Sequence, residues 1–581
     1  MKKLLILSIT TLLVLCGCSK KVTPKPDPSD DDTPLVEPYK DEVRALHEGS
    51  ISKPITLRFF KEYQHIPYID LSFYMKEFYF LDLNKSSSNG FYHYYKDDIS
   101  LDVDTENNTF AISDIDEICN LRQFSEIVDF ANTFSDHKGV QVPKKTFEFN
   151  NYDIELREGE GEAYLPLVTL NNIFTWVFGY SVSYNGKDVY VLNESAEVYE
   201  NASVNDYDDY YSIISSKTKI YEDESKFNYS ELCFAIDELT GHPASINIGK
   251  DELEEKGLDR VLDDYPLLKE ALKSTVMNTY LNAQFLLHSI LMYDGGHAGC
   301  LYQPSDITKA WEILENDTNL GIKQQEVGVR TANKMAARNG VRQYRPYDGN
   351  MYYHLESDVA YIGFDSFVVN YEGWYDHYVN EADLPDFTTD SMMFIRHFLE
   401  LVYNYGYKNV VIDIASNGGG DVLALDGVLS LLVSGNVERH TMNTINNHLY
   451  STYSQIDRDF DGLYTDADID IPYNLNFAIL TSNYSFSCGN ALPTVAKDEG
   501  IMIIGEQSGG GSCYVGVYND LFGAEYRVSG MTKLFNSDGI ENDFGVPVDE
   551  GLIVYDSNDQ KSYQRFYDYS YVNQKMNEFY N

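Results

Sequence analysis

The chain has 581 residues, of which 43% are hydrophobic, enough to build several domains with apolar cores. It carries 91 acidic and 44 basic residues, which gives a formal net charge of −47. Because there is no excess of Lys or Arg to neutralise phosphates, this balance argues against nucleic acid as a partner. It also argues against polybasic docking to a membrane.

The first 17 residues have the pattern of an export signal. Lys2 and Lys3 precede an apolar stretch, residues 4–14, that is too short to cross a bilayer. Residues 15–18 then resemble the lipobox of bacterial lipoproteins, which implies cleavage before Cys18 and diacylation of its thiol. We expect a signal peptide over 1–17 and a lipid on Cys18 that anchors the protein at the extracellular face of the cell membrane. The alternative is an ordinary secretory signal with an incidental cysteine.

Residues 18–48 are predicted to form a disordered tether. Residues 19–38 are rich in Lys, Pro, Asp and Ser and contain few apolar side chains, so they cannot bury enough surface to fold. Five prolines in this stretch favour an extended spacer.

Residues 50–200 are predicted to form an α+β module. Two stretches, beginning at residues 65 and 162, each run from a strand through a short helix to a hairpin around Asn or Gly turns. The module is therefore predicted to contain two related halves.

Residues 205–310 are predicted to form a helical subdomain. Apolar residues between 268 and 291 recur at helical spacing, which predicts one long helix that stops at residues 294–296. His297 follows this stop directly.

Residues 350–581 alternate strands with helices. Continuous apolar runs at 410–414, 477–480 and 501–504 are typical of buried parallel strands. This alternation predicts an α/β domain with a mostly parallel sheet.

Two segments of this domain combine features that carry chemistry. The strand 410–414 ends in a turn containing three glycines, 418–420, whose backbone N–H groups could approach a ligand closely. The strand 477–480 leads to Ser485 and Ser487, just before a predicted helix. A Ser at a helix start suits a nucleophile, because the helix N-terminus and the next N–H favour developing negative charge. The alternative is that either Ser is only a helix N-cap.

Together these segments resemble the tail-specific, or carboxyl-terminal processing, serine peptidases, a family that includes the tricorn protease core. Residues 413–420 resemble the motif D-L-R-x-N-x-G-G, with Ala415 in place of Arg. Ser487 takes the place of the nucleophile, and Gly505-Glu506 that of the closing G-E pair. The resemblance covers roughly residues 265–555 and implies a crotonase/ClpP-like catalytic core. It also implies an oxyanion hole made by the N–H groups of Gly419 and Cys488.

One departure concerns the base. The family's Ser–Lys branch places a Lys after the G-E pair, but residues 507–512 contain none; Lys497 or Lys533 would have to substitute. The tricorn-like branch instead uses a His after a long helix and a Glu late in the chain, which His297 and Glu541 resemble. The resemblance therefore implies a triad of Ser487, His297 and Glu541, in which Glu541 orients the imidazole directly or through a hydroxyl.

Residues 457–468 resemble a calcium loop inserted between strands. Acidic residues occupy positions 1, 3, 5 and 12, and Gly occupies position 6. The expected ligands are Asp457, Asp459, Asp461 and Asp468, and the expected ion is a structural Ca²⁺. The alternative is a solvated acidic loop.

These features predict a lipid-anchored extracellular serine endopeptidase, without a cofactor for its chemistry, that hydrolyses peptides or unfolded proteins through an acyl-enzyme on Ser487. The first alternative is a catalytically inactive relative that binds peptides, suggested by the missing Lys and by Ala415. The second is a surface-adhesion protein in which the 50–200 module is the functional part.

Overall fold

The computed structural model describes residues 39–48, 51–115, 118, 130–136, 142–174, 180–193, 217, 219–301, 304, 306–469, 473–555 and 560–581. The predicted signal peptide 1–17, Cys18 and residues 19–38 of the predicted tether lie outside these residues, so the lipid anchor stays a prediction. Within the described part of the chain, no helix combines the length and apolar character needed to cross a membrane.

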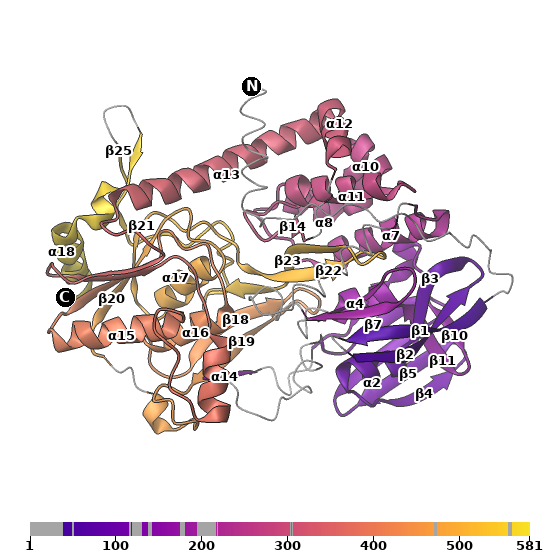
Figure 1. Ribbon diagram of the computed structural model, residues 1–581, viewed down its shortest axis with the longest axis horizontal. Coiled ribbons are helices and arrows are strands. Elements are labelled where there is room, and N and C mark those ends of the chain that lie inside the picture. Colours follow the sequence, from indigo (N-terminus) through magenta and orange to yellow (C-terminus); the bar gives the residue numbers. More distant parts are fainter. Residues whose placement is uncertain are drawn as a thin grey trace.

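The N-terminal region contains two antiparallel-rich sheets (Figure 1). The larger has the order β10-β11-β3-β2-β1-β13-β12 and the smaller β4-β5-β6-β7-β9. The larger is built from β1 (Tyr39–Glu48), β2 (Ile51–Phe60), β3 (Tyr63–Asp70), β10 (Arg157–Gly159), β11 (Glu162–Pro166), β12 (Tyr180–Tyr184) and β13 (Val189–Asn193). The smaller contains β4 (Asn84–Ser88), β5 (Phe91–Lys96), β6 (Ile99–Asp104), β7 (Thr109–Ile112) and β9 (Lys145–Glu148).

The two similar stretches of this region lie side by side. β3 leads into α2 (Leu71–Tyr79), β11 leads into α4 (Leu167–Phe174), and β3 and β11 pair antiparallel. Asp70 caps α2 by accepting a hydrogen bond from the Phe73 N–H, so the strand-to-helix junction is set by local sequence.

Two predicted boundaries of this region were wrong. Residues 39–48 do not belong to a disordered tether: they form β1, which pairs antiparallel with β2 and parallel with β13. The 50–200 segment is also not one unit, because β8 (Ala131–Ser135) pairs with β19 (His448–Ile456), a strand far along the chain. In both cases a strand pairs with another strand that is distant in the sequence: β1 with β13, and β8 with β19. Composition alone does not reveal such pairing.

The middle of the chain is helical. Its helices are α7 (Glu222–Leu239), α8 (Lys250–Lys256), α9 (Leu258–Val261), α10 (Pro266–Leu272), α11 (Met277–Leu286), α12 (Thr308–Asn316) and α13 (Thr318–Tyr344). The long helix predicted over 268–291 is in fact broken: Val276 is extended and forms a bridge with Lys219 between α10 and α11. A π-helical turn, Leu287–Leu291, then precedes His297.

The predicted α/β domain is confirmed. Its sheet has the order β15-β16-β17-β20-β21-β24, in which only β15 runs antiparallel to its neighbour. The strands are β15 (Met351–His354), β16 (Ala360–Phe364), β17 (Asn409–Asp413), β20 (Asn476–Thr481), β21 (Met502–Gly505) and β24 (Glu550–Gly551).

Helices cover both faces of this parallel sheet. Ile412 packs in a core shared with α15 (Ser391–Asn404), α16 (Val422–Ser430) and α17 (Cys488–Asp498). Val411 packs in the opposite core, shared with α13 and α18 (Tyr569–Tyr580). Successive side chains on β17 thus point to opposite cores, which explains its continuous apolar sequence.

A third, antiparallel sheet joins the helical region to the α/β domain. Its order is β14-β23-β18-β19-β8, with β22 also paired to β23. Its further strands are β14 (Gly299–Cys300), β18 (Val437–Asn443), β22 (Cys513–Asn519) and β23 (Glu525–Phe535). The remaining described α-helix is α14 (Tyr371–Asn380), and the remaining described strands are the hairpin of β25 (Val554–Tyr555) with β26 (Lys561–Ser562). Helix α13 runs along one side of the molecule from the helical region to the parallel-sheet end (Figure 1).

Candidate active site

The glycine turn after β17 lies directly against Ser487. A Cβ atom added to Gly419 would lie 2.7 Å from the Ser487 Cβ and 3.2 Å from its Oγ. Only a residue without a side chain fits there, so the two predicted segments come together at the carboxyl ends of neighbouring parallel strands β17 and β20.

Ser487 has a strained backbone, and its hydroxyl does not cap the helix that follows it. Its φ of 56° and ψ of −122° are rare for a residue other than glycine. Its N–H donates to the Gly510 carbonyl at 3.0 Å, which holds this conformation. Although Ser487 stands at the N-cap position of α17, its side chain makes no capping hydrogen bond. The hydroxyl is therefore available for chemistry.

Ser485, the other candidate nucleophile, uses its hydroxyl in two hydrogen bonds to the backbone. It is fully buried, and its Oγ donates to the Ile414 carbonyl at 2.8 Å and accepts from the Ser482 N–H at 3.0 Å. These bonds tie the turn after β20 to the turn after β17, so Ser485 has a structural position.

His297 lies in a loop that Asp294 organises. The Asp294 Oδ1 atom accepts the N–H groups of Gly296, His297 and Ala298 at 3.1, 2.9 and 3.2 Å. β14 follows at once and pairs with β23, with Gly299 opposite Arg527. This register brings His297 beside Ser529.

The His297 ring ends a short relay. Its Nδ1 lies 3.4 Å from the Ser529 Oγ, and that hydroxyl donates to the Asp294 Oδ2 at 2.5 Å. The opposite ring nitrogen, Nε2, is buried and has no hydrogen-bond partner among the described residues. The ring packs against Phe486, the residue before Ser487, with the ring centroids 4.7 Å apart.

The electrostatics favour a neutral imidazole beside an ionised carboxylate. Burial lowers the pKa of His297, and the positive charges of Lys334 and Arg527 act in the same direction, whereas Asp294 and Asp543 oppose them. Burial also acts to raise the pKa of Asp294, but His297, Ser529 and the loop N–H groups outweigh it, so that pKa is lowered. A neutral imidazole can accept a proton, and Asp294 would stabilise the resulting cation.

The structure does not give Glu541 the orienting position predicted for it. Glu541 forms an ion pair with Lys533 at 3.0 Å, and the carboxylate linked to His297 is Asp294. The Lys533 side chain is only 5% exposed and needs a counter-charge, which Glu541 supplies. Asp294 is visible in the sequence three residues before His297, but Ser529 is not, because it depends on the pairing of β14 with β23.

The two predicted oxyanion donors, the backbone N–H groups of Gly419 and Cys488, are not equally available for a new hydrogen bond. The Gly419 N–H donates to the Asn417 Oδ1 at 2.8 Å, so a bound oxyanion would compete with that side chain. The Cys488 N–H begins α17, where the first amides have no partner within the helix. The Cys488 thiol donates to the Gly420 carbonyl, and burial raises its pKa to about 12, which makes it a poor nucleophile. Cys488 and Cys513 are both buried free thiols.

Neither Lys named from the sequence is placed to act as the base. Lys497 pairs with Asp549 at 2.9 Å and donates to the Pro547 carbonyl. Burial acts to lower the pKa of Lys533, but Cys513 and Glu541 outweigh it, so Lys533 stays protonated.

Lys334 was not predicted from the sequence, although it contacts both the loop that carries His297 and the Phe486 ring beside Ser487. It projects from α13, donates to the Gly295 carbonyl at 2.7 Å and lies 3.6 Å from the centroid of the Phe486 ring. Burial lowers the pKa of Lys334 to about 7. No local motif marks this residue, because α13 reaches the site only through tertiary packing.

Residues 359–549 match the model of peptidase family S41. The S41-matching segment contains Gly419, Ser487 and Ser529, whereas Asp294 and His297 precede it.

Comparison with solved structures gives weak overall similarity. The photosystem II D1 C-terminal processing protease is 18% identical over 36% of this chain and 49% of its own, with a TM-score of 0.26. Mature CPAF is 15% identical over 43% of this chain and 62% of its own, with a TM-score of 0.27. A lipoprotein from Streptococcus agalactiae is 14% identical over 42% of this chain and 83% of its own, with a TM-score of 0.27. The chain therefore spans about half the length of the first of these proteins. No curated protein matches the chain.

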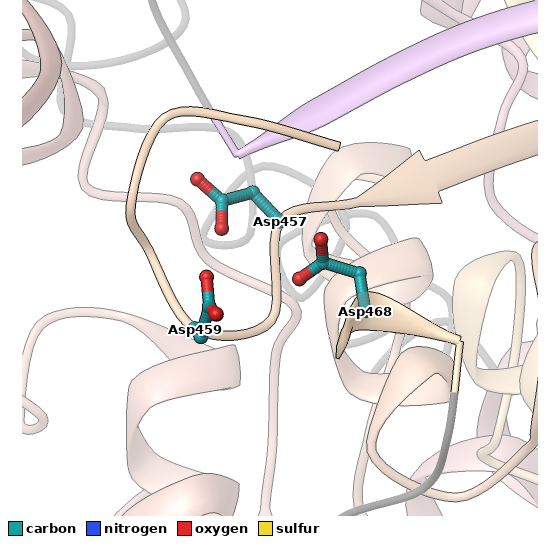
Figure 2. A group of neighbouring side chains, drawn as sticks. All are labelled: Asp457, Asp459 and Asp468. Carbon is teal, nitrogen blue, oxygen red and sulfur yellow. The ribbon is translucent and has the colours of Figure 1, made fainter. Parts of the chain in front are cut away.

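The acidic loop of the S41-matching segment gathers three of its four predicted ligands. Carboxylate oxygens of Asp457, Asp459 and Asp468 all lie within 4.8 Å of one another (Figure 2). Asp461 is not part of this cluster, and its Oδ1 instead accepts the Leu463 N–H at 2.8 Å. Asp457 also accepts the Gly462 N–H at 2.7 Å, which closes the loop around the cluster.

Proposed function

We propose that the chain is an extracellular serine endopeptidase with a crotonase-like core that hydrolyses peptides or unfolded proteins through an acyl-enzyme on Ser487. The observation that carries this proposal is the state of His297. Its Nδ1 is tied through Ser529 to Asp294, while its buried Nε2 has no partner and its ring packs beside the Phe486–Ser487 segment. The match to peptidase family S41 supports the same reaction class.

In the proposed reaction the His297 Nε2 accepts the proton of the Ser487 hydroxyl while Oγ bonds to the substrate carbonyl carbon. The His297 cation is stabilised by Asp294 through Ser529. The C–N bond then breaks, and His297 returns the proton to the leaving amine. Water repeats the sequence on the acyl-enzyme and releases the second product. The Cys488 N–H, at the start of α17, would stabilise the oxyanion.

A fluorophosphonate probe tests this proposal, because it labels only an activated serine. The wild type should be labelled, and both Ser487→Ala and His297→Ala should lose the label. Ser529→Ala should label at least about tenfold more slowly, since the imidazole loses the group that positions its Nδ1. Ser537→Ala, an exposed serine, should label like the wild type. Labelling that persists in Ser487→Ala would rule out this nucleophile.

The second candidate function is a peptide-binding relative without catalysis. Two observations favour it: Ala415 replaces the Arg of the family motif, and the Gly419 N–H is occupied by Asn417. A wild type that is never labelled and cleaves no peptide library, but still binds peptides, would establish this function instead.

We also propose that a lipid on Cys18 holds the protein at the outer face of the membrane, on the evidence of the lipobox-like residues 15–18. Metabolic labelling with a clickable fatty acid tests it. Labelling should disappear in Cys18→Ala, and the protein should move from the membrane to the medium.

The acidic loop is proposed to bind a structural Ca²⁺ through Asp457, Asp459 and Asp468, because oxygen-rich clusters of this kind suit that ion. Calcium should raise the melting temperature of the wild type relative to chelator. Asp459→Asn should lose this response, whereas the exposed neighbour Asp466→Asn should keep it. Identical melting of the wild type with and without chelator would exclude the site.

A further inference from the structure

An aromatic groove of about 1020 Å³ lies between strand β15 and helix α15. Seven aromatic residues line it: Tyr352, which is buried, and Tyr347, Tyr353, Phe387, Phe394, Phe398 and Tyr405. Tyr353 stacks on Phe398 with ring centroids 4.2 Å apart, yet stays 47% exposed, and Tyr405 is 69% exposed. A concave surface lined by accessible aromatic rings is typical of binding sites.

One wall of the groove is an open sheet edge. Within the described sheet, β15 pairs only with β16 and ends the order. An edge strand presents unpaired N–H and C=O groups, which can pair with an added extended chain. The aromatic rings beside it would take the alternate side chains of that chain.

The groove reaches the proposed catalytic turn. Its residues Ser366 and Val368 are exposed and flank Phe367, whose N–H donates to the Gly419 carbonyl at 3.0 Å. The Ser366 hydroxyl donates to the same carbonyl at 3.3 Å. Because Gly419 lies against Ser487, a chain in the groove would continue toward the nucleophile.

A second connection runs through β15 itself. The Tyr352 hydroxyl donates to the Asp413 carboxylate, whose Oδ1 accepts the Ala415 N–H at 2.9 Å. Asp413 ends β17 just before the glycine turn. The edge strand and the turn are therefore held in a fixed relation.

The acidic residues of the groove would favour ligands without negative charge. Among the described residues, the lining of the groove includes Asp348 and Glu356 but no Lys, Arg or His. Acidic segments would be repelled, whereas apolar side chains would bury against the rings.

We propose that this groove is a docking subsite for the substrate chain, which adds to β15 as an extended strand and places aromatic or aliphatic side chains against Tyr353 and Phe398. The inference rests on the proposed peptidase function, because it assigns the groove to a segment of the chain being cleaved. Substrates would thus be extended, apolar and poor in acidic residues.

Fluorescence anisotropy on Ser487→Ala, which cannot turn over its ligand, tests the subsite. The probe is a labelled peptide of about 12 residues with alternating Phe or Leu, long enough at ~3.3 Å per residue to span the groove and the turn. Adding Tyr353→Ala and Tyr405→Ala to the Ser487→Ala background should weaken binding at least about tenfold. Adding Tyr555→Ala instead, an equally exposed tyrosine outside the groove, should not change binding.

Two modified probes separate strand addition from simple apolar adhesion. N-methylation of alternate residues should abolish binding, because it removes the N–H donors of the added strand. Replacing two apolar residues by Asp should also abolish it. Circular dichroism and melting of every variant establish that it is folded.

The outcomes distinguish this inference from the proposed function. If the wild type cleaves peptides but the groove variants bind and cleave as the Tyr555→Ala control does, the groove inference is wrong and the peptidase stands. If the wild type cleaves nothing and Ser487→Ala still binds through Tyr353, the groove stands without the peptidase. If no apolar peptide binds Ser487→Ala, or binding is insensitive to N-methylation, strand addition in the groove is refuted.

Discussion

At the scale of single residues, the proposed base is controlled by charges from several elements. Asp294 belongs to its own loop, Lys334 to α13, Arg527 to β23, and Asp543 to the segment before β24. Lys334 also contacts the loop carrying His297, through the Gly295 carbonyl. It therefore both positions the loop and lowers the proton affinity of the imidazole.

Replacing Lys334 should shift the pH dependence of catalysis. The Lys334 charge helps to keep the pKa of His297 below its usual value, so Lys334→Met should raise that pKa. The acid limb of kcat/KM, which reports protonation of the base in the free enzyme, should then move to higher pH. Activity would be lost at a higher pH as the solution is acidified. Lys334→Arg, which keeps the charge, is the control, and an acid limb unchanged in Lys334→Met would refute this electrostatic role.

Local sequence was sufficient to predict some residues of the site and not others. Ser487 and the glycine turn each follow a buried strand, so their neighbourhood could be predicted from parallel-sheet geometry. Ser529 could not, because its place beside His297 depends on Gly299 pairing with Arg527 across 228 positions of the chain. The tertiary partners of an imidazole are set by strand register, which this sequence does not encode locally.

At the scale of elements, glycines hold the turns around Ser487, the proposed nucleophile. Gly510 has a φ of +84°, its carbonyl accepts the Ser487 N–H, and an added Cβ would lie 1.9 Å from the Asp543 carbonyl oxygen. Gly500 has a similar φ of +76°, but an added Cβ would meet nothing within 4 Å. Alanine at Gly500 would therefore add only backbone strain, whereas alanine at Gly510 would add the same strain and a steric clash.

Gly510→Ala should therefore abolish labelling of Ser487, because the loop must shift to relieve the clash. Gly500→Ala should keep activity and lose only about 1 kcal/mol of stability from the unfavourable φ. Probe labelling and thermal unfolding of both variants measure the difference. Equal labelling of the two variants would show that the Gly510 turn does not position the nucleophile.

Some helices and strands were predicted correctly and others were not, because local sequence does not encode pairing with distant segments. β-branched runs such as 410–414 identify buried parallel strands without knowledge of their neighbours. The break between α10 and α11 was missed, because apolar spacing continues through Val276 while its backbone pairs with Lys219. Tertiary pairing overrides helical periodicity there.

At the scale of the whole molecule, a buried polar network joins the N-terminal region to the antiparallel sheet. Asn172 on α4 exchanges hydrogen bonds with the backbone of Asn519 on β22, at 3.0 Å in each direction. Glu231 on α7 accepts from the Asn172 side chain at 3.0 Å and from the Thr169 hydroxyl at 2.5 Å. The Glu231 carboxyl thus binds α4 directly and is linked to β22 through the Asn172 side chain, so its protonation acts on a junction of three regions of the chain.

Glu231 should make stability fall as pH rises. Burial raises its pKa from 4.5 to about 7. Below about pH 4.5 the carboxyl is protonated in both the folded and unfolded states, and its burial carries no ionisation cost. Between 4.5 and 7 the unfolded state releases the proton while the folded state keeps it, so the free energy of unfolding decreases. Above 7 this cost is constant.

Glu231→Gln removes this titration and keeps a side chain of the same shape. The variant should gain melting temperature over the wild type on going from pH 5 to pH 8, by an amount equivalent to about 1–3 kcal/mol, because the wild type must bury a charge at the higher pH. Glu255→Gln, on an exposed position of α8, should show no such change. Thermal unfolding of the three proteins at both pH values measures the effect. A melting difference between Glu231→Gln and the wild type that is the same at pH 5 and pH 8 would show that Glu231 is not the carboxyl through which pH acts on the junction of α4, α7 and β22.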